Sequence, residues 1–211
     1  MLVGITGGIG SGKSTIVQVL AARGYAVYDC DREAKRIIVE NAEVRKAIIA
    51  LLGTEAFVPS PKHPFTGSYN TSYVSQRVFA EPELLQQLNA IVHPAVKEEI
   101  RVQSSEVRVQ NSEFSVLFVE SAILFEAGID SLCDRIVVVD APEEVRLQRT
   151  IARDYHGEAT EEHINKVRAR MRAQQFRPSD EQKATKKVLT IINDGRTSIS
   201  DLANEIIQFI S

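Results

Sequence analysis

The chain has 211 residues, of which 44% are hydrophobic, so it can bury a full core and suits one domain with a small insertion. Its formal net charge is only −3, which argues against overall attraction to nucleic acid or to an anionic membrane. We expect neither a signal peptide nor a membrane helix, because no charged n-region precedes an apolar one and no apolar run approaches ~20 residues. The two cysteines, Cys30 and Cys133, lie far apart and form neither a metal-type cluster nor a disulfide framework, which favours a cytoplasmic location.

Short apolar runs rich in β-branched residues alternate with longer segments of helical period. We expect strands at residues 2–6, 25–28, 115–119, 135–139 and 188–192. This alternation predicts an α/β fold with one five-stranded parallel sheet flanked by helices, since strands covered on both faces are continuously apolar. Ligands bind outside the carboxyl ends of such strands, so Thr6, Asp29, Glu120 and Asp140 are candidates by position.

The first expected strand runs directly into residues 7–14, GGIGSGKS, which complete the GxxxxGK[ST] pattern of a phosphate loop. Glycines such as Gly8, Gly10 and Gly12 allow backbone angles at which successive N–H groups turn towards an anion. Lys13 adds a mobile positive charge, and Ser14 offers a hydroxyl to Mg²⁺. Residues 14–22 read as a helix whose positive N-terminal end faces the same anion, so the sequence predicts a nucleotide site here.

More than eighty residues separate the second and third strands, too many for a single crossover helix, so we expect an insertion. Its first helix is expected over residues 31–52 and ends at Gly53. Residues 59–68 are rich in proline and predict a loop. Two further helices are expected over residues 81–90 and 94–110, because Pro82 and Pro94 suit a first helical turn.

After the fourth strand, Pro142 is expected to open a helix that carries Arg146, Arg149 and Arg153. Their spacing of i, i+3 and i+7 places the three guanidinium groups along one face. A second basic segment follows, with Arg168, Arg170, Arg172 and Arg177. Interspersed glutamates are typical of a solvated charged face, but beside a nucleotide site such arginines favour a clamp on phosphates.

Several segments together match a known pattern: the phosphate loop, residues 29–34 (DCDREA), residues 88–94 (LNAIVHP), residues 123–126 (ILFE) and residues 193–195 (NDG). They resemble the dephospho-CoA kinase family, including its LNxxxHP element, its PLLFE segment and its base-binding loop. Members of that family phosphorylate the ribose 3′-hydroxyl of dephospho-CoA in the last step of coenzyme A synthesis. Two departures are Ala122, where the family usually has proline, and Thr71, where it commonly has arginine.

The resemblance implies an ATP- and Mg²⁺-dependent kinase with a P-loop NTPase fold in three parts. Residues 1–30, 112–145 and 178–211 would form the core, residues 31–111 a helical insertion that holds the acceptor, and residues 146–177 an arginine-rich lid. Its partners would be the small molecules ATP and dephospho-CoA, with no nucleic acid and no membrane. We expect a monomer or a weak homo-oligomer.

Roles for individual residues also follow from the resemblance. The ATP phosphates would be cradled by Gly8, Gly10, Ser11, Gly12, Lys13, Ser14 and Thr15. Lys13 would follow the migrating charge, while Arg149 and Arg153 would clamp the transition state. Asn193 and Gly195 would lie against the adenine. Ser14 would bind Mg²⁺, and Glu120 either reaches the metal through water or caps the next helix.

On the acceptor side, Asp31 would orient and deprotonate the hydroxyl. Two residues apart on an extended chain, Asp29 and Asp31 would point to the same side, and Asp31 could instead cap a helix that starts at residue 32. His93 could bind substrate or simply complete a helix turn. Thr6, Asp29, His93 and Glu126 complete the expected substrate site.

Two other functions compete with this one. The first is another P-loop small-molecule kinase, acting on a nucleoside, a nucleoside monophosphate or a shikimate-like alcohol. The second is a GTP-dependent switch, which needs a DxxG element after a strand and an NKxD motif. The DxxG of residues 154–157 follows the arginine helix and NKxD is absent from the sequence, so the switch is disfavoured.

Overall fold

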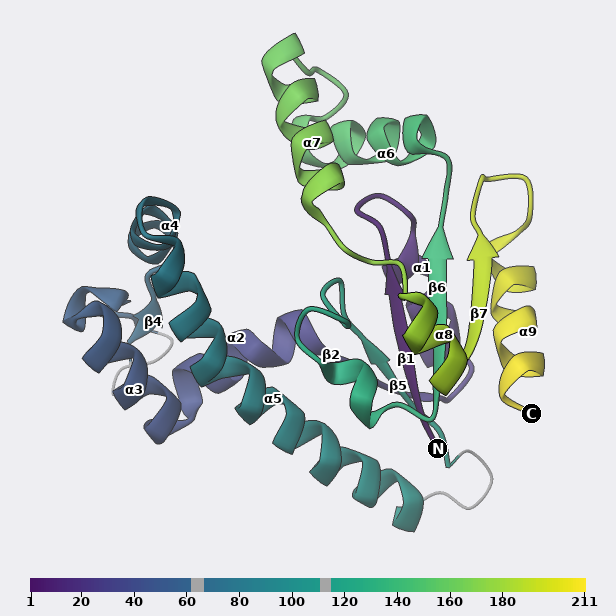
Figure 1. The fold of residues 1–211 in the computed structure, drawn as a ribbon, viewed down its shortest axis with the longest axis horizontal. Coiled ribbons are helices and arrows are strands. Elements are labelled where there is room, and N and C mark those ends of the chain that lie inside the picture. Colours follow the sequence, from purple (N-terminus) through teal and green to yellow (C-terminus); the bar gives the residue numbers. More distant parts are fainter. Residues whose placement is uncertain (62–66, 111–114) are drawn as a thin grey trace. The chain divides into compact units, whose positions relative to one another are not determined.

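The computed structural model describes residues 1–61, 67–110 and 115–211 (Figure 1). The chain divides into two compact units. Met1–Tyr28 and Gln103–Ser211 form the first, and Asp29–Val102 form the second. Within the described ranges, no helix combines the length and the apolarity needed to cross a membrane.

The first unit is built on a five-stranded sheet with the strand order β2-β5-β1-β6-β7. The strands are β1 (Leu2–Gly7), β2 (Ala26–Asp29), β5 (Leu117–Glu120), β6 (Arg135–Asp140) and β7 (Lys187–Ile192). β1 pairs in parallel with β5 and β6, and β6 pairs in parallel with β7. The predicted α/β fold with five parallel strands is therefore confirmed, with strand ends shifted by one or two residues.

The register of the sheet brings the strand ends together at one edge. Ile5 lies opposite Glu120, and Gly7 lies opposite Val139. Asp140 at the end of β6 lies opposite Ile192 at the end of β7. The segments that follow these strands therefore start side by side, which is where ligands bind in parallel sheets.

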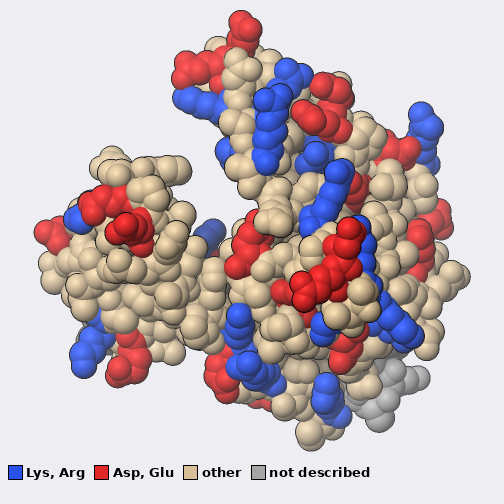
Figure 2. Space-filling model, in the orientation of Figure 1, with Lys and Arg blue, Asp and Glu red and all other residues tan. Residues whose placement is uncertain are grey.

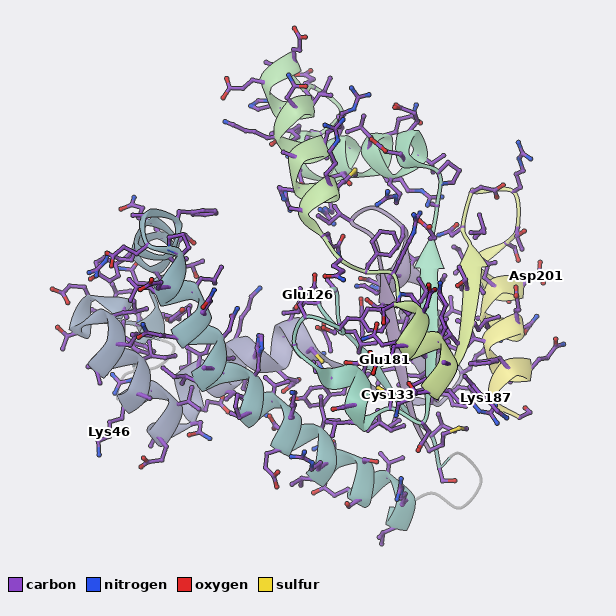
Figure 3. The ribbon with its side chains drawn as sticks, viewed as in Figure 1. Lys46, Glu126, Cys133, Glu181, Lys187 and Asp201 are labelled. Atoms are coloured by element: carbon purple, nitrogen blue, oxygen red, sulfur yellow. The ribbon has the colours of Figure 1, made fainter. Side chains whose placement is uncertain are left out.

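Helices α1 (Lys13–Ala22) and α9 (Ile199–Ile210) cover one face of the sheet, and they share a core cluster with alternate strand residues such as Val3, Ile5 and Phe118. Leu202, Ile206 and Ile210 recur every four residues along α9, which gives that helix one apolar stripe. The other face is packed so closely that a Cβ on Gly4 of β1 would lie 2.9 Å from both Cys133 Sγ and Leu124 Cδ2. Burial raises the pKa of the Cys133 thiol to about 12, so this cysteine is an inert core residue (Figure 3).

After β6 the chain forms the α6–α7 pair, made of α6 (Glu143–Tyr155) and α7 (Glu161–Ala173). Leu147 of α6 and Val167 and Met171 of α7 form a small core between the two helices. The turn that joins them uses positive φ at His156 and Gly157. Short helix α8 (Asp180–Thr185) then leads into β7.

The second unit is helical, with α2 (Cys30–Glu40), α3 (Ala42–Leu52), α4 (Thr71–Ala80) and the first part of α5 (Pro82–Gln110). A 3-10 turn (Thr54–Ala56) precedes β3 (Phe57–Val58), which pairs antiparallel with β4 (Ser68–Tyr69). The predicted loop at residues 59–68 joins these two strands, and its residues 62–66 lie outside the described residues. Gly53 ends α3 with φ of 89°, as expected.

Two helix boundaries expected from the sequence are wrong. The helix predicted over residues 31–52 is interrupted at Asn41, whose φ of −80° and ψ of 112° are extended. Its side chain accepts hydrogen bonds from Glu43 N and Val44 N, so Asn41 ends α2 and caps α3. Asn70 caps α4 in the same way by accepting from Tyr73 N, and α4 was not predicted.

Pro94 does not start a helix but lies inside α5, which runs through it. Proline has no backbone N–H to donate to the preceding turn, so it is disfavoured in helix interiors. Val92, Val96 and Ile100 are all at most 8% exposed and form a buried stripe of period four across this position. Tertiary packing on this stripe outweighs the local cost of the proline.

Candidate active site

The phosphate loop lies between β1 and α1 and has the backbone that its glycines permit. Gly10 and Gly12 have φ of 78° and 85°, which favours glycine. Space is also limiting, since a Cβ on Gly10 would lie 2.3 Å from Arg146 O, and one on Gly12 would lie 2.3 Å from Asn193 Nδ2. Glycine is therefore favoured at both positions for two reasons: the positive φ, and the lack of space for a Cβ atom.

The N-terminus of α1 is suited to an anion. Gly12 occupies the cap position without a side-chain hydrogen bond, and the first turn contains no acidic residue. The first N–H groups of a helix have no partner within it and carry partial positive charge. A phosphate group would satisfy these donors, so the loop fits the nucleotide predicted from the sequence.

Lys13, Ser14 and Glu120 meet where α1 begins and β5 ends. Glu120 Oε1 accepts hydrogen bonds from Lys13 Nζ at 2.7 Å and from Ser14 Oγ at 2.6 Å. The Lys13 and Glu120 side chains are only 12% and 10% exposed. A hydroxyl and a carboxylate are hard oxygen donors of the kind that Mg²⁺ takes together with phosphate oxygens, so this pair fits the expected metal. Among the described residues no group of three or more His, Cys, Asp or Glu could hold a metal on its own.

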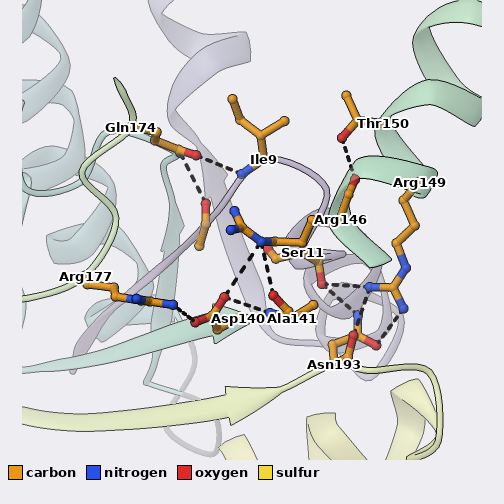
Figure 4. A network of polar contacts seen from close by, with 11 residues as sticks. Ile9, Ser11, Asp140, Ala141, Arg146, Arg149, Thr150, Gln174, Arg177 and Asn193 are labelled. Carbon is orange, nitrogen blue, oxygen red and sulfur yellow. Dashed lines mark hydrogen bonds and ion pairs between the residues drawn. The ribbon is translucent and has the colours of Figure 1, made fainter. Parts of the chain in front are cut away.

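Arg149 of α6 and Asn193, which follows β7, close over the loop (Figure 4). Asn193 is 2% exposed, and its Nδ2 donates to Ser11 O at 2.8 Å. Arg149 donates to Asn193 O at 2.9 Å and to Ser11 O at 3.4 Å. Gly195 has φ of 89°, and a Cβ there would lie 3.6 Å from Arg149 Nη2. The structure therefore brings the predicted phosphate-binding, lid and base-binding segments into contact.

The three arginines of α6, which their spacing predicts on one helix face, have different surroundings. Arg146 is only 7% exposed; its Nε donates to Ala141 O at 3.1 Å, and its guanidinium lies 5.3 Å from the Phe176 ring centre. A Cβ on Gly8 would lie 2.4 Å from Arg146 Nη1, so this guanidinium packs against the loop.

Arg153 points to solvent and is 61% exposed, and its Nε donates to Asp154 Oδ1 at 2.7 Å. Asp154 raises the pKa of Arg153 through this hydrogen bond. Three arginines of the second basic segment are also paired: Arg168 with Glu144, Arg170 with Asp154, and Arg177 with Asp140. Figure 2 shows Lys and Arg beside Asp and Glu over α6 and α7. In this conformation Arg149 is the α6 arginine that hydrogen-bonds to the phosphate loop.

Gln174, the residue at which α7 ends, lies in the lid segment that the resemblance implies, but no role of its own was expected for it. Its Oε1 accepts from Ile9 N at 2.8 Å, and its Nε2 donates to Gly7 O and to Ala122 O. The next residue, Gln175, donates its backbone N–H to Glu126 at 3.1 Å. Figure 3 labels Glu126 in the segment that follows β5. A glutamine in a basic segment has no sequence pattern that reveals these contacts.

Two buried hydroxyls at the site have no hydrogen-bond partner within the described part of the chain. They belong to Thr6, the penultimate residue of β1, and to Ser11 of the loop. Thr6 is 0% exposed and Ser11 is 1% exposed. A buried polar group without a partner costs free energy, which makes both hydroxyls candidates for a ligand contact.

In the second unit, Asp29 and Asp31 have different local roles. Asp29 Oδ1 accepts from Asp31 N at 3.0 Å and from Arg32 N at 3.1 Å, so Asp29 is the N-cap of α2. The alternative in which Asp31 caps a helix from residue 32 is wrong, because α2 begins at Cys30 and Asp31 lies in its first turn. The extended geometry assumed for this pair does not hold either.

The second unit also contains His93 and a cavity of about 380 Å³. His93 is half-buried inside α5, and burial, with a smaller contribution from Lys97, lowers its pKa, so the ring is neutral at pH 7. Burial raises the pKa of Tyr69 at the cavity, which keeps its hydroxyl protonated. The cavity is lined by Lys35, Arg36, Val39, Glu40, Tyr69 and Thr71.

Comparison with known proteins gives consistent matches over the length of the chain. The family model for dephospho-CoA kinase matches residues 1–198. The dephospho-CoA kinase of Chlorobaculum tepidum is 38% identical over 208 residues, covering 99% of this chain and 92% of that protein. The dephospho-CoA kinase of Bacteroides fragilis is 35% identical over 208 residues with the same coverage. The crystal structure of TT1252 from Thermus thermophilus aligns with a TM-score of 0.73 at 31% identity, covering 99% of this chain and 96% of that one.

Proposed function

This chain belongs to the dephospho-CoA kinase family, and from that premise we propose how its residues transfer the γ-phosphate of ATP to the ribose 3′-hydroxyl of dephospho-CoA. The resemblance stated from the sequence is confirmed, as is the P-loop NTPase fold. The reaction is the last step of coenzyme A synthesis. The observation that carries the assignment is the complete phosphate loop, with Glu120 holding Lys13 and Ser14, and Arg149 bonded to Ser11 O.

On the donor side, the backbone N–H groups of the loop would receive the ATP phosphates. The residues concerned are Gly8, Gly10, Ser11, Gly12, Lys13, Ser14 and Thr15. Lys13 would leave Glu120 and follow the charge that moves from the γ-phosphate to the leaving oxygen. Asn193 and Gly195 would lie against the adenine, supported by their closeness to Arg149.

Ser14 and Glu120 would hold the metal, which when bound neutralises charge on the β and γ oxygens. Their shared hydrogen bond already places the two oxygens 2.6 Å apart. Ser14 suits direct binding, and Glu120 suits a hydrogen bond to metal-bound water. Mg²⁺ is the ion we propose, because both donors are hard oxygens.

On the acceptor side, Asp31 would accept the proton of the 3′-hydroxyl while the oxygen attacks the γ-phosphorus. The O–P bond to the ribose forms, the bond between the γ-phosphorus and the bridging oxygen breaks, and ADP leaves. Thr6, Asp29, His93 and Glu126 are proposed to support substrate binding. The cavity lined by Tyr69 and Thr71 is proposed to bind part of the acceptor. Because residue 71 is threonine and not the arginine common in the family, this binding would not involve a guanidinium group at that position.

Three parts of the sequence-based expectation stay predictions. They are the cytoplasmic location, the monomeric or weakly oligomeric state, and the absence of nucleic-acid and membrane partners. The proposed division of labour is an acceptor-binding insertion over residues 31–111 and a lid over residues 146–177. The insertion is supported by the fact that Asp31 and the Tyr69 cavity lie in one compact unit while the phosphate loop lies in the other. Residues 146–177 belong to the same unit as the phosphate loop, so the lid stays a prediction.

We expect dephospho-CoA to be the one good acceptor in a panel with adenosine, AMP and shikimate. The protein is incubated with Mg·ATP and each compound, and ADP formation is followed. A 3′-deoxy analogue of dephospho-CoA is the matched control and should yield no ADP above background. Comparable turnover of AMP would overturn the assignment in favour of a nucleoside monophosphate kinase.

We expect Arg149→Ala to lower kcat by on the order of 10², with a smaller change in KM for ATP, because a clamp formed in the transition state contributes less to ground-state binding. Arg153→Ala should act in the same direction but more weakly, since Arg153 is 61% exposed and held by Asp154. Steady-state kinetics check this, with Lys166→Ala as the control because Lys166 lies on α7 and pairs with Glu162. Weaker ATP binding at unchanged kcat would favour the alternative interpretation, in which both arginines belong to a solvated charged face and do not clamp the transition state.

A further inference from the structure

The side-chain amide of Gln174 connects three segments that are distant in sequence. Its Oε1 accepts from Ile9 N at 2.8 Å, and its Nε2 donates to Gly7 O at 3.3 Å and to Ala122 O at 2.9 Å. Gly7 and Ile9 belong to the phosphate loop, and Ala122 follows β5. Gln174 itself is the residue at which α7 ends (Figure 4).

These contacts require both halves of a primary amide. Ile9 N can only donate and the two carbonyls can only accept, so the residue between them must offer one acceptor and two donors. A carboxylate in the same place offers no donor, and an apolar side chain offers neither. Glutamine is the side chain of this length that satisfies all three partners.

The residues beside Gln174 hold the same end of the α6–α7 pair in place. Gln175 N bonds to Glu126, Phe176 packs on Arg146, and Arg177 pairs with Asp140 at 2.7 Å. Gln174 is the member of this segment whose side chain hydrogen-bonds to the backbone of the loop. The position of α7 is therefore tied to the backbone of residues 7–9.

Ser11 N bonds to Gly8 O at 3.0 Å, so the first half of the loop is a tight turn whose shape depends on residues 7–9. The Gln174 amide hydrogen-bonds to both Ile9 N and Gly7 O, and these two bonds fix the backbone conformation of the turn. The free backbone N–H groups at the start of α1 then point to the position where a phosphate group would bind.

We propose that Gln174 is a positioning residue for ATP, which holds the first half of the phosphate loop in its binding shape and couples it to the end of α7. The inference rests on one part of the proposed function, the binding of ATP, and does not depend on the identity of the acceptor. Gln174 acts through the loop backbone and not by contact with the reacting atoms.

The test compares Gln174→Met and Gln174→Glu with Gln175→Met, and titrates each protein with Mg·ATP in a calorimeter. Gln175 is the matched control, since it is the adjacent glutamine and is exposed. We expect Gln174→Met to raise the ATP Kd by about 10-fold, the order expected for losing hydrogen bonds that preorganise a site, and Gln175→Met to leave it unchanged. In kinetics, KM for ATP should rise more than KM for dephospho-CoA. Because ATP binding is measured without acceptor, this test can fail for Gln174 even if the acceptor is dephospho-CoA, and it can succeed even if the proposed acceptor is wrong.

Titration at several pH values separates positioning from simple loss of packing. The carboxylate that Gln174→Glu introduces would face two carbonyl oxygens, and on protonation it regains one donor and keeps one acceptor. The loss of ATP affinity in Gln174→Glu, relative to wild type at the same pH, should therefore shrink between pH 8 and pH 5.5, while that of Gln174→Met should not. Wild-type affinity in Gln174→Met, an equal loss in Gln175→Met, or a pH-independent loss in Gln174→Glu would each overturn the proposal.

Discussion

Lys13→Ala is expected to lower kcat by on the order of 10²–10³, with dephospho-CoA and Mg·ATP at saturation. The reason is that Lys13 is the one cationic side chain within residues 7–14, where phosphate charge grows and moves during transfer. Its Nζ lies 2.7 Å from Glu120 Oε1 in this structure, so the charge is held at the start of α1 before nucleotide arrives. Steady-state and single-turnover rates measure the loss.

This substitution also affects stability, and the two effects must be separated. The Glu120 side chain is only 10% exposed, and removing Lys13 leaves its carboxylate without the cation that it faces. Breaking such a buried pair costs about 3–5 kcal/mol. Lys13→Met combined with Glu120→Gln removes both charges, so we expect it to recover most of the lost thermal stability while the rate stays low. Recovery of a near-normal rate in that double variant would show that Lys13 has a structural role only.

The sheet could be predicted from the sequence because its strands carry their own pattern. Residues 116–119 and 136–139 are continuously apolar, which fits strands covered on both faces. The phosphate loop could be predicted because its function needs contiguous residues in one backbone shape. Both features depend on local sequence, and both were located to within two residues.

The helix boundaries of the insertion could not be predicted because non-local packing decides them. Asn41 interrupts an otherwise helical pattern by bonding to Glu43 N and Val44 N, and an asparagine inside such a pattern can equally remain helical. At Pro94 the local preference was overridden by the buried stripe that includes Val96 and Ile100. Sequence patterns state a preference, and tertiary contacts determine whether it is followed.

Within the site, the sequence located the arginine helix but not what each arginine does. Helical spacing placed Arg146, Arg149 and Arg153 on one face, yet they are respectively buried against Phe176, bonded to Ser11 O and paired with Asp154. Which guanidinium reaches the loop depends on how α6 packs on it, which no spacing rule contains. The contacts of Gln174 were missed for the same reason, since they join segments up to 167 residues apart.

We expect Asp31→Asn to lower kcat by roughly 10²–10⁴ while leaving ATP binding and thermal stability nearly unchanged. A positioned base that orients the acceptor hydroxyl contributes on this order. Asparagine keeps the shape of the side chain and loses only its charge, which in the first turn of α2 is worth less than about 1 kcal/mol. Phosphoryl transfer is usually loose, with the proton leaving late, so a weak base that orients the hydroxyl is sufficient.

Asp29→Asn is the matched comparison, because the structure assigns Asp29 a task that asparagine can also perform. Its Oδ1 is committed to Asp31 N and Arg32 N, and asparagine caps helices as well as aspartate does. Asp29→Ala, by contrast, should cost about 1 kcal/mol of stability through the lost cap. Thermal denaturation of these variants tests the cap independently of any turnover.

The rates of the two asparagine variants then decide which aspartate is the base. Capping occupies the Asp29 oxygen that the two amides share, whereas Asp31 takes part in that cap through its backbone N–H and not through its carboxylate. Asp31 also lies in the first turn of the helix that opens the unit containing the Tyr69 cavity. If Asp31→Asn keeps its rate and Asp29→Asn loses it, the catalytic carboxylate is the one that caps α2, and the role proposed for Asp31 is wrong.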